Sequence, residues 1–102
     1  MIRVDIVDDH PLMIEGLKNL IETSGVAEMT DSAGTGKACL NMLQFSQPDV
    51  LLMDIHLPDT NGIDLCKEVH TRWPDIVAKR QSLAHRTQRA ELWSSSIDLG
   101  AL

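Results

Sequence analysis

Three acidic residues stand where apolar runs of the sequence stop. Asp8 and Asp9 follow the apolar-rich run 2–7, and Asp54 follows the run 50–53. Side chains at the carboxyl ends of neighbouring parallel strands lie close together, and carboxylate oxygens are ligands that suit Mg²⁺. A carboxylate held beside Mg²⁺ can attack a phosphoryl group and form an acyl phosphate. The three residues therefore predict a phosphoryl-transfer site.

The elements that must position these residues alternate between strands and helices. We expect strands at 2–7, 26–32 and 50–53, and helices that begin at Pro11 and stop before Gly25, at 37–45 and at 63–72. Apolar residues recur at helical spacing in the helices, and the continuous run 50–53 is typical of a strand buried on both faces. This order predicts an α/β fold with a doubly wound parallel sheet. A strand at 76–82 is a weaker prediction, because the apolar content falls quickly there. The segment 88–99 has Ala90, Trp93 and Ile97 at helical spacing before Gly100, which predicts a further helix.

Composition indicates one small domain of an ordinary globular type. The chain has 102 residues, of which 43% are hydrophobic and 24% charged. No apolar run approaches the roughly 18 residues of a membrane span, and no signal peptide opens the chain, so we expect a cytoplasmic protein without a membrane partner. Residues 1–75 carry thirteen acidic and five basic side chains, whereas 76–102 carry two and four. Such an acidic body should not bind nucleic acid on its own. Cys39 and Cys66 show no metal or redox spacing.

Two motifs resemble a known family, the receiver domains of two-component response regulators. Residues 7–12 (VDDHPL), with 15–17 (EGL) behind them, resemble the opening of receivers that carry a LuxR-type helix-turn-helix output domain. Residues 48–58 (PDVLLMDIHLP), followed by 61–62 (NG), resemble the phosphoacceptor strand and its loop. The resemblance covers residues 2–76 and implies a flavodoxin-like receiver fold.

The resemblance implies a role for each candidate site residue. Asp54 would be the phosphoacceptor, Asp9 a direct Mg²⁺ ligand, Asp8 a ligand acting through water, and His56 a ligand through its backbone carbonyl. Ser82, 28 residues after Asp54, would be the hydroxyl that contacts the phosphoryl group. A sensor histidine kinase would supply the phosphoryl group, and DNA would be bound only through an output domain that is absent from this chain. The protein would not be an enzyme, although receivers catalyse their own phosphotransfer and dephosphorylation.

The second part of the chain departs from the family pattern. We expect 1–76 to be a typical receiver and 77–102 to be divergent and truncated, lacking the fifth strand, its Lys and the last helix. Lys79 and Arg80 stand where the family has apolar residues. Residues 77–96 fit the family pattern poorly. Divergence, a pair of compensating frameshifts or a truncation would each explain this. The uncovered sheet face and edge would favour a homodimer formed by strand or tail exchange.

Two other readings compete with an active receiver. A degenerate receiver would fold and act as an interaction module without switching. An EF-hand calcium loop would use four residues of the segment 57–68: Asp59, Asn61, Gly62 and Glu68. In that frame Leu57 occupies the first ligand position and a strand replaces the entering helix, so the pattern fits poorly.

Overall fold

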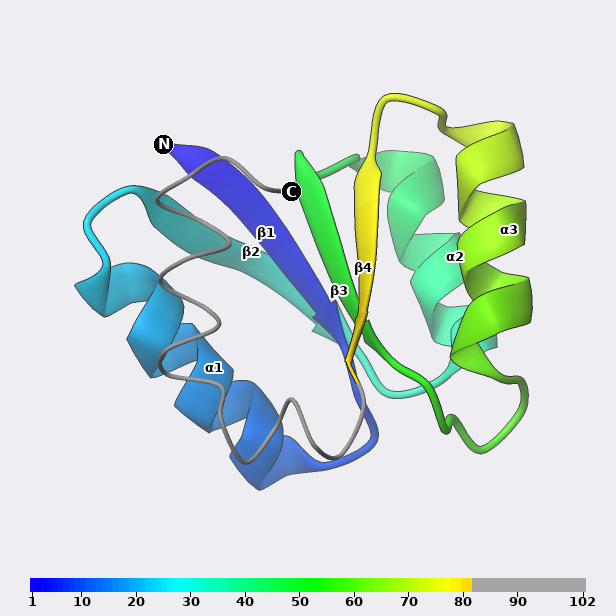
Figure 1. Ribbon diagram of the computed structural model, residues 1–102, viewed down its shortest axis with the longest axis horizontal. Helices are drawn as coiled ribbons and strands as arrows, with labels where there is room; N and C mark the ends of the chain where they lie inside the picture. The colour runs from blue at the N-terminus through cyan, green and yellow to red at the C-terminus, as the bar shows by residue number, and fades with distance from the viewer. Residues whose placement is uncertain (82–102) are drawn as a thin grey trace.

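Strands and helices alternate along residues 1–81, the part of the chain that the computed structural model describes. The elements are β1 (Ile2–Val7), α1 (Pro11–Thr23), β2 (Ala27–Ala33), α2 (Gly36–Phe45), β3 (Val50–Asp54), α3 (Gly62–Arg72) and β4 (Val77–Gln81). All strand pairs are parallel, in the order β2-β1-β3-β4 (Figure 1). The predicted doubly wound α/β fold is confirmed, and β1 and β3 are neighbours.

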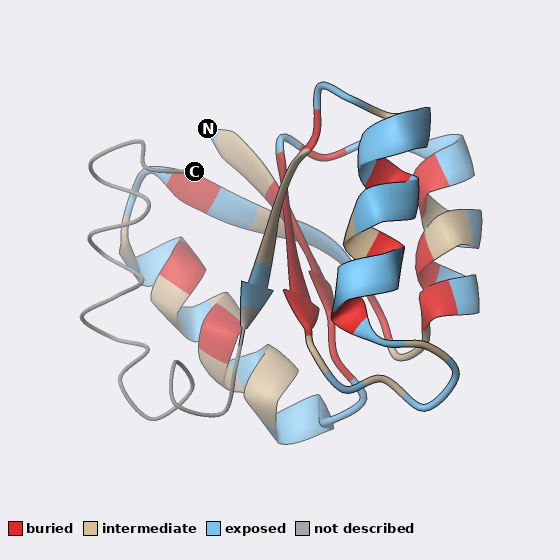
Figure 2. Cartoon of the chain, turned by 45° about the vertical axis from the view of Figure 1, so that its right-hand side comes forward, coloured by how far each residue is buried: buried red, intermediate tan, exposed pale blue. Residues whose placement is uncertain are grey.

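Helices cover both faces of this sheet. Helix α1 packs on one face, and α2 and α3 lie side by side on the other (Figure 1). The core on the α1 face consists of Val4, Ile6, Leu17, Ile21, Ala27, Val50 and Leu52. The core on the α2–α3 face consists of Val7, Ala33, Cys39, Leu43, Leu51, Met53, Leu65, Val69 and Ile76. Both clusters draw on β1 and β3, because alternate residues of a strand face opposite sides of a sheet. Buried residues accordingly run along these two strands and the inner sides of the helices (Figure 2).

Local signals explain where the helices begin. Pro11 starts α1, where its missing N–H costs no hydrogen bond. The side chains of Thr35 and Asn61 cap α2 and α3 by accepting hydrogen bonds from the backbone N–H of Ala38 at 3.0 Å and of Asp64 at 2.8 Å. Gly25 turns the chain after α1 with a φ of 78°, a conformation that favours glycine.

The fourth strand, a weaker prediction, is present as β4. It pairs with β3 from Val50↔Val77 to Asp54↔Gln81. The polar side chains are tolerated because Arg80 is exposed and Lys79 is only partly buried. The helix predicted at 88–99 lies outside the described residues. Within the described part of the chain, no helix is long and apolar enough to cross a bilayer.

Candidate metal and phosphoryl site

The three predicted carboxylates meet at the carboxyl edge of the sheet. Asp54 ends β3, and Asp8 and Asp9 directly follow β1. The register pairs Val7 of β1 with Met53 of β3, so Asp8 and Asp54, the residues that come next in the chain, lie side by side. Together with His10, these residues offer ligand atoms that all lie within 4.8 Å of one another. The adjacency of β1 and β3 thus produces the predicted cluster.

Two of the carboxylates are deeply buried. Asp8 is 2% exposed and Asp54 5% exposed, whereas Asp9 lies at the surface. The backbone N–H of Asp8 donates to the carbonyl of Ala33 at 3.0 Å, which fixes this end of β1 against β2. Buried carboxylates this close repel one another, and burial weakens the screening of that repulsion. A cation at this position would therefore be strongly favoured.

His10 and His56 both contact the cluster. The ring Nδ1 of His10 is 2.7 Å from Asp8 Oδ1, 3.0 Å from Asp9 Oδ1 and 3.9 Å from Asp54 Oδ2. The backbone N–H of His56 donates to Asp54 Oδ1 at 3.2 Å. The role of the His56 carbonyl as a metal ligand stays a prediction. Ser82, the remaining predicted residue, follows Gln81 and lies outside the described residues.

The loop 55–61 after Asp54 is held by its own backbone. The N–H of Leu57 donates to the carbonyl of Thr60 at 3.2 Å, and the N–H of Gly62 donates to the carbonyl of Ile55 at 2.7 Å. A side chain at Gly62 would be too close to the strand, because a Cβ there would lie 2.6 Å from the carbonyl oxygen of Asp54. Glycine is thus required by the close approach of α3 to the end of β3.

Asp59 ties this loop to the start of α2, a contact that the sequence did not predict. Its carboxylate accepts hydrogen bonds from the backbone N–H of Gly36 at 2.8 Å and of Lys37 at 3.0 Å. These N–H groups hold the pKa of Asp59 below its usual range. Because this carboxylate is engaged at α2 and the strand β3 leads into the loop, the calcium-loop reading gains no support here.

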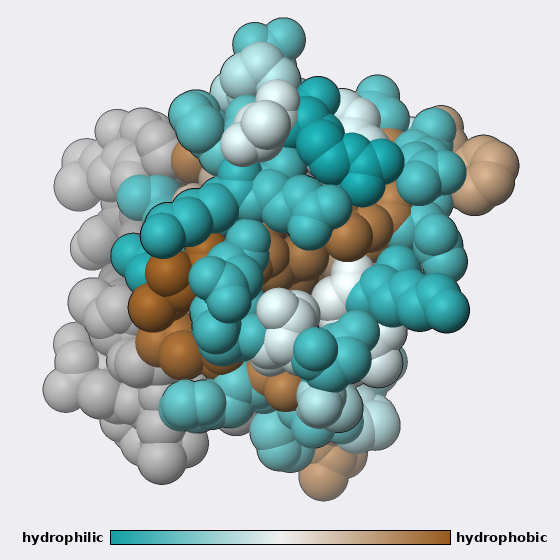
Figure 3. Space-filling model, turned by 90° about the vertical axis from the view of Figure 1, so that its right-hand side faces the viewer, coloured by the Kyte–Doolittle hydropathy of each residue, from teal (hydrophilic) through white to brown (hydrophobic). Residues whose placement is uncertain are grey.

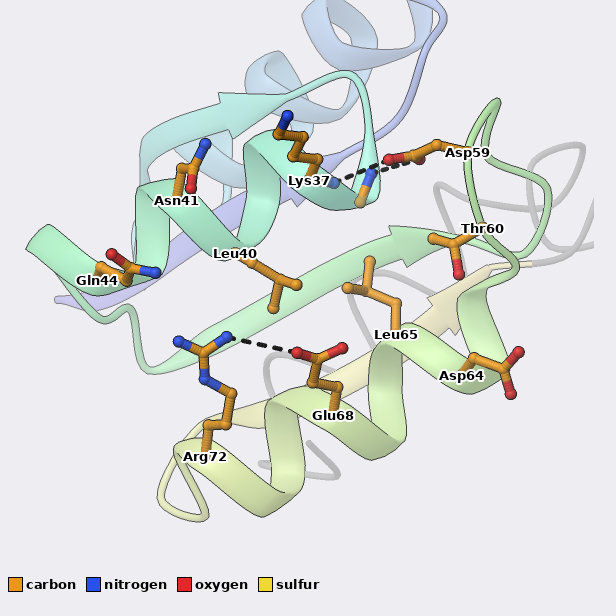
Figure 4. Close-up of a pocket in the computed structure, with 11 residues that line it drawn as sticks. Lys37, Leu40, Asn41, Gln44, Asp59, Thr60, Asp64, Leu65, Glu68 and Arg72 are labelled. Carbon is orange, nitrogen blue, oxygen red and sulfur yellow. Dashed lines mark hydrogen bonds and ion pairs between the residues drawn. The ribbon is translucent and has the colours of Figure 1, made fainter.

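A groove between α2 and α3 lies beside Asp59. Figure 3 shows an apolar strip between polar walls on this face. Leu40 of α2 and Leu65 of α3 point toward one another in it (Figure 4). Arg72 and Glu68 form an ion pair of 3.4 Å on its α3 side. This groove lies away from the carboxylate cluster and shares none of its residues.

The donor set fits a hard divalent cation. Asp8, Asp9 and Asp54 supply carboxylate oxygens from two strand ends, and Asp9 keeps the cluster open to solvent. Mg²⁺ prefers one or two carboxylates together with several waters and phosphate oxygens. The residues present therefore fit Mg²⁺, with Asp9 as the carboxylate that faces solvent.

Comparisons with known proteins agree with this geometry. The family model of the response regulator receiver domain matches residues 4–90. The DNA-binding transcriptional activator DevR/DosR of Mycobacterium tuberculosis is 34% identical over 76 residues, which cover 74% of this chain and 35% of that protein. The transcriptional regulatory protein YdfI of Bacillus subtilis is 38% identical over 103 residues, which cover 99% of this chain and 46% of that protein. The chain thus spans less than half of the length of these relatives.

Solved structures show the same fold. The signal receiver domain of the response regulator NarL from Mycobacterium tuberculosis matches with a TM-score of 0.72 and 26% identity, over 91% of this chain and 77% of that one. RcsB from Salmonella enterica serovar Typhimurium, bound to the promoter rprA in the presence of the phosphomimetic BeF3-, matches with a TM-score of 0.73 and 24% identity, over 78% of this chain and 46% of that one. The second likeness shows the fold alone.

Proposed function

The chain belongs to the response regulator receiver domain family, and we propose that it is a phosphorylation-dependent switch whose phosphoacceptor is Asp54. The phosphoryl group would come from a sensor histidine kinase in the cytoplasm, with Mg²⁺ bound at the cluster. The relatives are transcriptional regulators, so the switch would control a DNA-binding output domain. Residues 1–76 would form the typical part of the receiver and 77–102 the divergent part.

One observation carries this proposal. Asp54, 5% exposed at the end of the central strand β3, lies in a cluster with the two carboxylates that directly follow β1. A buried acid beside other acids is unfavourable unless hydrogen bonds or a cation offset the charge, and Mg²⁺ held by the three carboxylates would do so. An isolated Asp at a strand end would not require this convergence.

The chain's own residues can support transfer of the phosphoryl group to Asp54. A carboxylate oxygen of Asp54 forms the new P–O bond while the bond from phosphorus to the donor breaks, and the donor leaves with that electron pair. His56 holds Asp54 Oδ1 through its backbone N–H, which limits rotation of the nucleophile. Asp8 and Asp9 would hold Mg²⁺, which when bound would neutralise charge on the phosphoryl oxygens. Ser82 would contact one of those oxygens.

Phosphorylation by a small donor tests the assignment. The full chain is incubated with acetyl phosphate and Mg²⁺, and the modified residue is located by mass spectrometry. We expect modification of the wild type and of Asp59→Asn, an exposed acid of the neighbouring loop, but none of Asp54→Asn. Chelation of Mg²⁺ should abolish modification. Equal modification of the wild type and Asp54→Asn would refute the assignment. A folded wild type that is never modified would favour the degenerate receiver.

A further inference from the structure

We infer that His10 is a positioning residue, which holds the carboxylate of Asp8 in the orientation that the metal site needs. The inference rests on the proposed function, because it concerns the same Mg²⁺ site. Two donors of His10 converge on one oxygen: the backbone N–H lies 2.9 Å and the ring Nδ1 2.7 Å from Asp8 Oδ1. An ionised carboxylate only accepts hydrogen bonds, so Nδ1 carries the proton. Two donors on one oxygen fix the rotation of the carboxylate about its Cβ–Cγ bond.

The same ring nitrogen also draws in the adjacent acid. Nδ1 lies 3.0 Å from Asp9 Oδ1, within ion-pair distance, so the ring contacts carboxylates of two consecutive residues. Without the ring these carboxylates would turn apart, because like charges repel. The His10 ring is itself 57% exposed, whereas the Asp8 side chain is only 3% exposed. The ring therefore lies over the buried carboxylate on the solvent side.

The backbone of His10 is well placed for this role. His10 is the N-cap of α1, and its carbonyl accepts hydrogen bonds from the N–H of Met13 at 3.0 Å and of Ile14 at 3.2 Å. Pro11 follows with a locked φ. The His10 side chain does not cap the helix, so its ring serves the carboxylates instead. Groups that orient metal ligands commonly change metal affinity when they are replaced.

Three substitutions of His10 test the inference by Mg²⁺ titration calorimetry on the full chain. His10→Ala removes the donor and His10→Gln moves it one bond further from the backbone. His10→Asn keeps an N–H group on Cγ, where Nδ1 is attached. We expect the dissociation constant for Mg²⁺ to rise about tenfold in the first two variants and to stay within about threefold of wild type in the third. In an Asp8→Asn background, His10→Ala should raise the dissociation constant by a smaller factor, because only the contact between Nδ1 and Asp9 is then lost.

The outcomes separate this inference from the proposed function. Equal Mg²⁺ affinity in wild type, His10→Ala and His10→Gln would overturn the inference while leaving phosphorylation of Asp54 intact. Loss of Ni²⁺ or Zn²⁺ binding with unchanged Mg²⁺ affinity would also overturn it, because His10 would then be a ligand. A change in melting temperature with unchanged Mg²⁺ affinity would indicate only a structural role for the ring and would count against the inference. Failure of the wild type to bind Mg²⁺ would instead contradict the proposed function.

Discussion

Replacing Gly62 by alanine should destabilise the fold at the base of the phosphoacceptor loop. The added Cβ would lie 2.6 Å from the carbonyl oxygen of Asp54 and 3.0 Å from the Cα of Ile55. Both atoms belong to the backbone, so no side-chain rotation can relieve the contact, and α3 or the end of β3 must shift. Overpacking typically costs about 1–3 kcal/mol of folding free energy, and a contact with rigid backbone should cost about 3 kcal/mol. The higher helix propensity of alanine returns at most about 1 kcal/mol, which leaves about 2 kcal/mol of destabilisation.

Thermal and urea unfolding followed by circular dichroism measure this effect. A loss of about 2 kcal/mol lowers the melting temperature of a domain of this size by roughly 8–16 °C. Gly34→Ala is the matched control, because Gly34 also lies near the site but its added Cβ would be 3.9 Å from the nearest atom, the carbonyl oxygen of Asp8. The control should unfold close to wild type. Equal midpoints for Gly62→Ala and Gly34→Ala would refute the steric argument.

Three further predictions concern titratable groups. Burial raises the pKa of Asp5, although the hydrogen bond from the Thr30 hydroxyl opposes this shift. The stabilisation from Asp5 is therefore complete below the usual pKa of an aspartate and is lost as the pH rises through the raised pKa. Asp5→Asn should raise the urea midpoint more near neutral pH than below about pH 4. Backbone N–H groups lower the pKa of Asp59, so the stabilisation from Asp59 is complete above the usual pKa of an aspartate and is lost as the pH falls through the lowered pKa. Asp59→Ala should flatten that part of the plot of unfolding free energy against pH. An unchanged slope would count against the contact between Asp59 and α2. Burial raises the pKa of the Cys39 thiol to about 12, so a maleimide at neutral pH should label Cys66 first and Cys39 only on unfolding. Peptide mapping identifies the labelled cysteine, and early labelling of Cys39 would contradict its burial.

The strand ends of the site were predictable, whereas contacts between distant segments were not. The run 50–53 and the pair Asp8 and Asp9 predicted the cluster, because parallel strands of this topology bring their carboxyl ends to one edge. The Asp59 contact with α2 joins residues 22 and 23 positions apart. Nothing in the loop sequence distinguishes an acid that caps a remote helix from an acid that contacts only water.

The buried acid of β1 illustrates the same limit. Asp5 interrupts the apolar run 2–7, and alternation alone would assign it to a solvent face. The structure buries it to 2% exposure, because helices cover both faces of the sheet, and gives it the hydroxyl of Thr30 as a partner 25 residues away. The burial of Asp5 depends on helix packing. Its partner depends on the register between β1 and β2, which shifts between Val4 and Asp5.

Two exposed connections of this chain should have very different evolutionary tolerance for changes in length. The segment 55–61 is cross-linked by the Leu57–Thr60 and Gly62–Ile55 backbone bonds, so one inserted residue would break several hydrogen bonds at once. In contrast, Gly25 and Val26 are exposed in the turn between α1 and β2. Insertions are accepted where the backbone is exposed and lightly bonded. Among descendants of this sequence, gained and lost residues should therefore gather near Gly25 and spare 55–61.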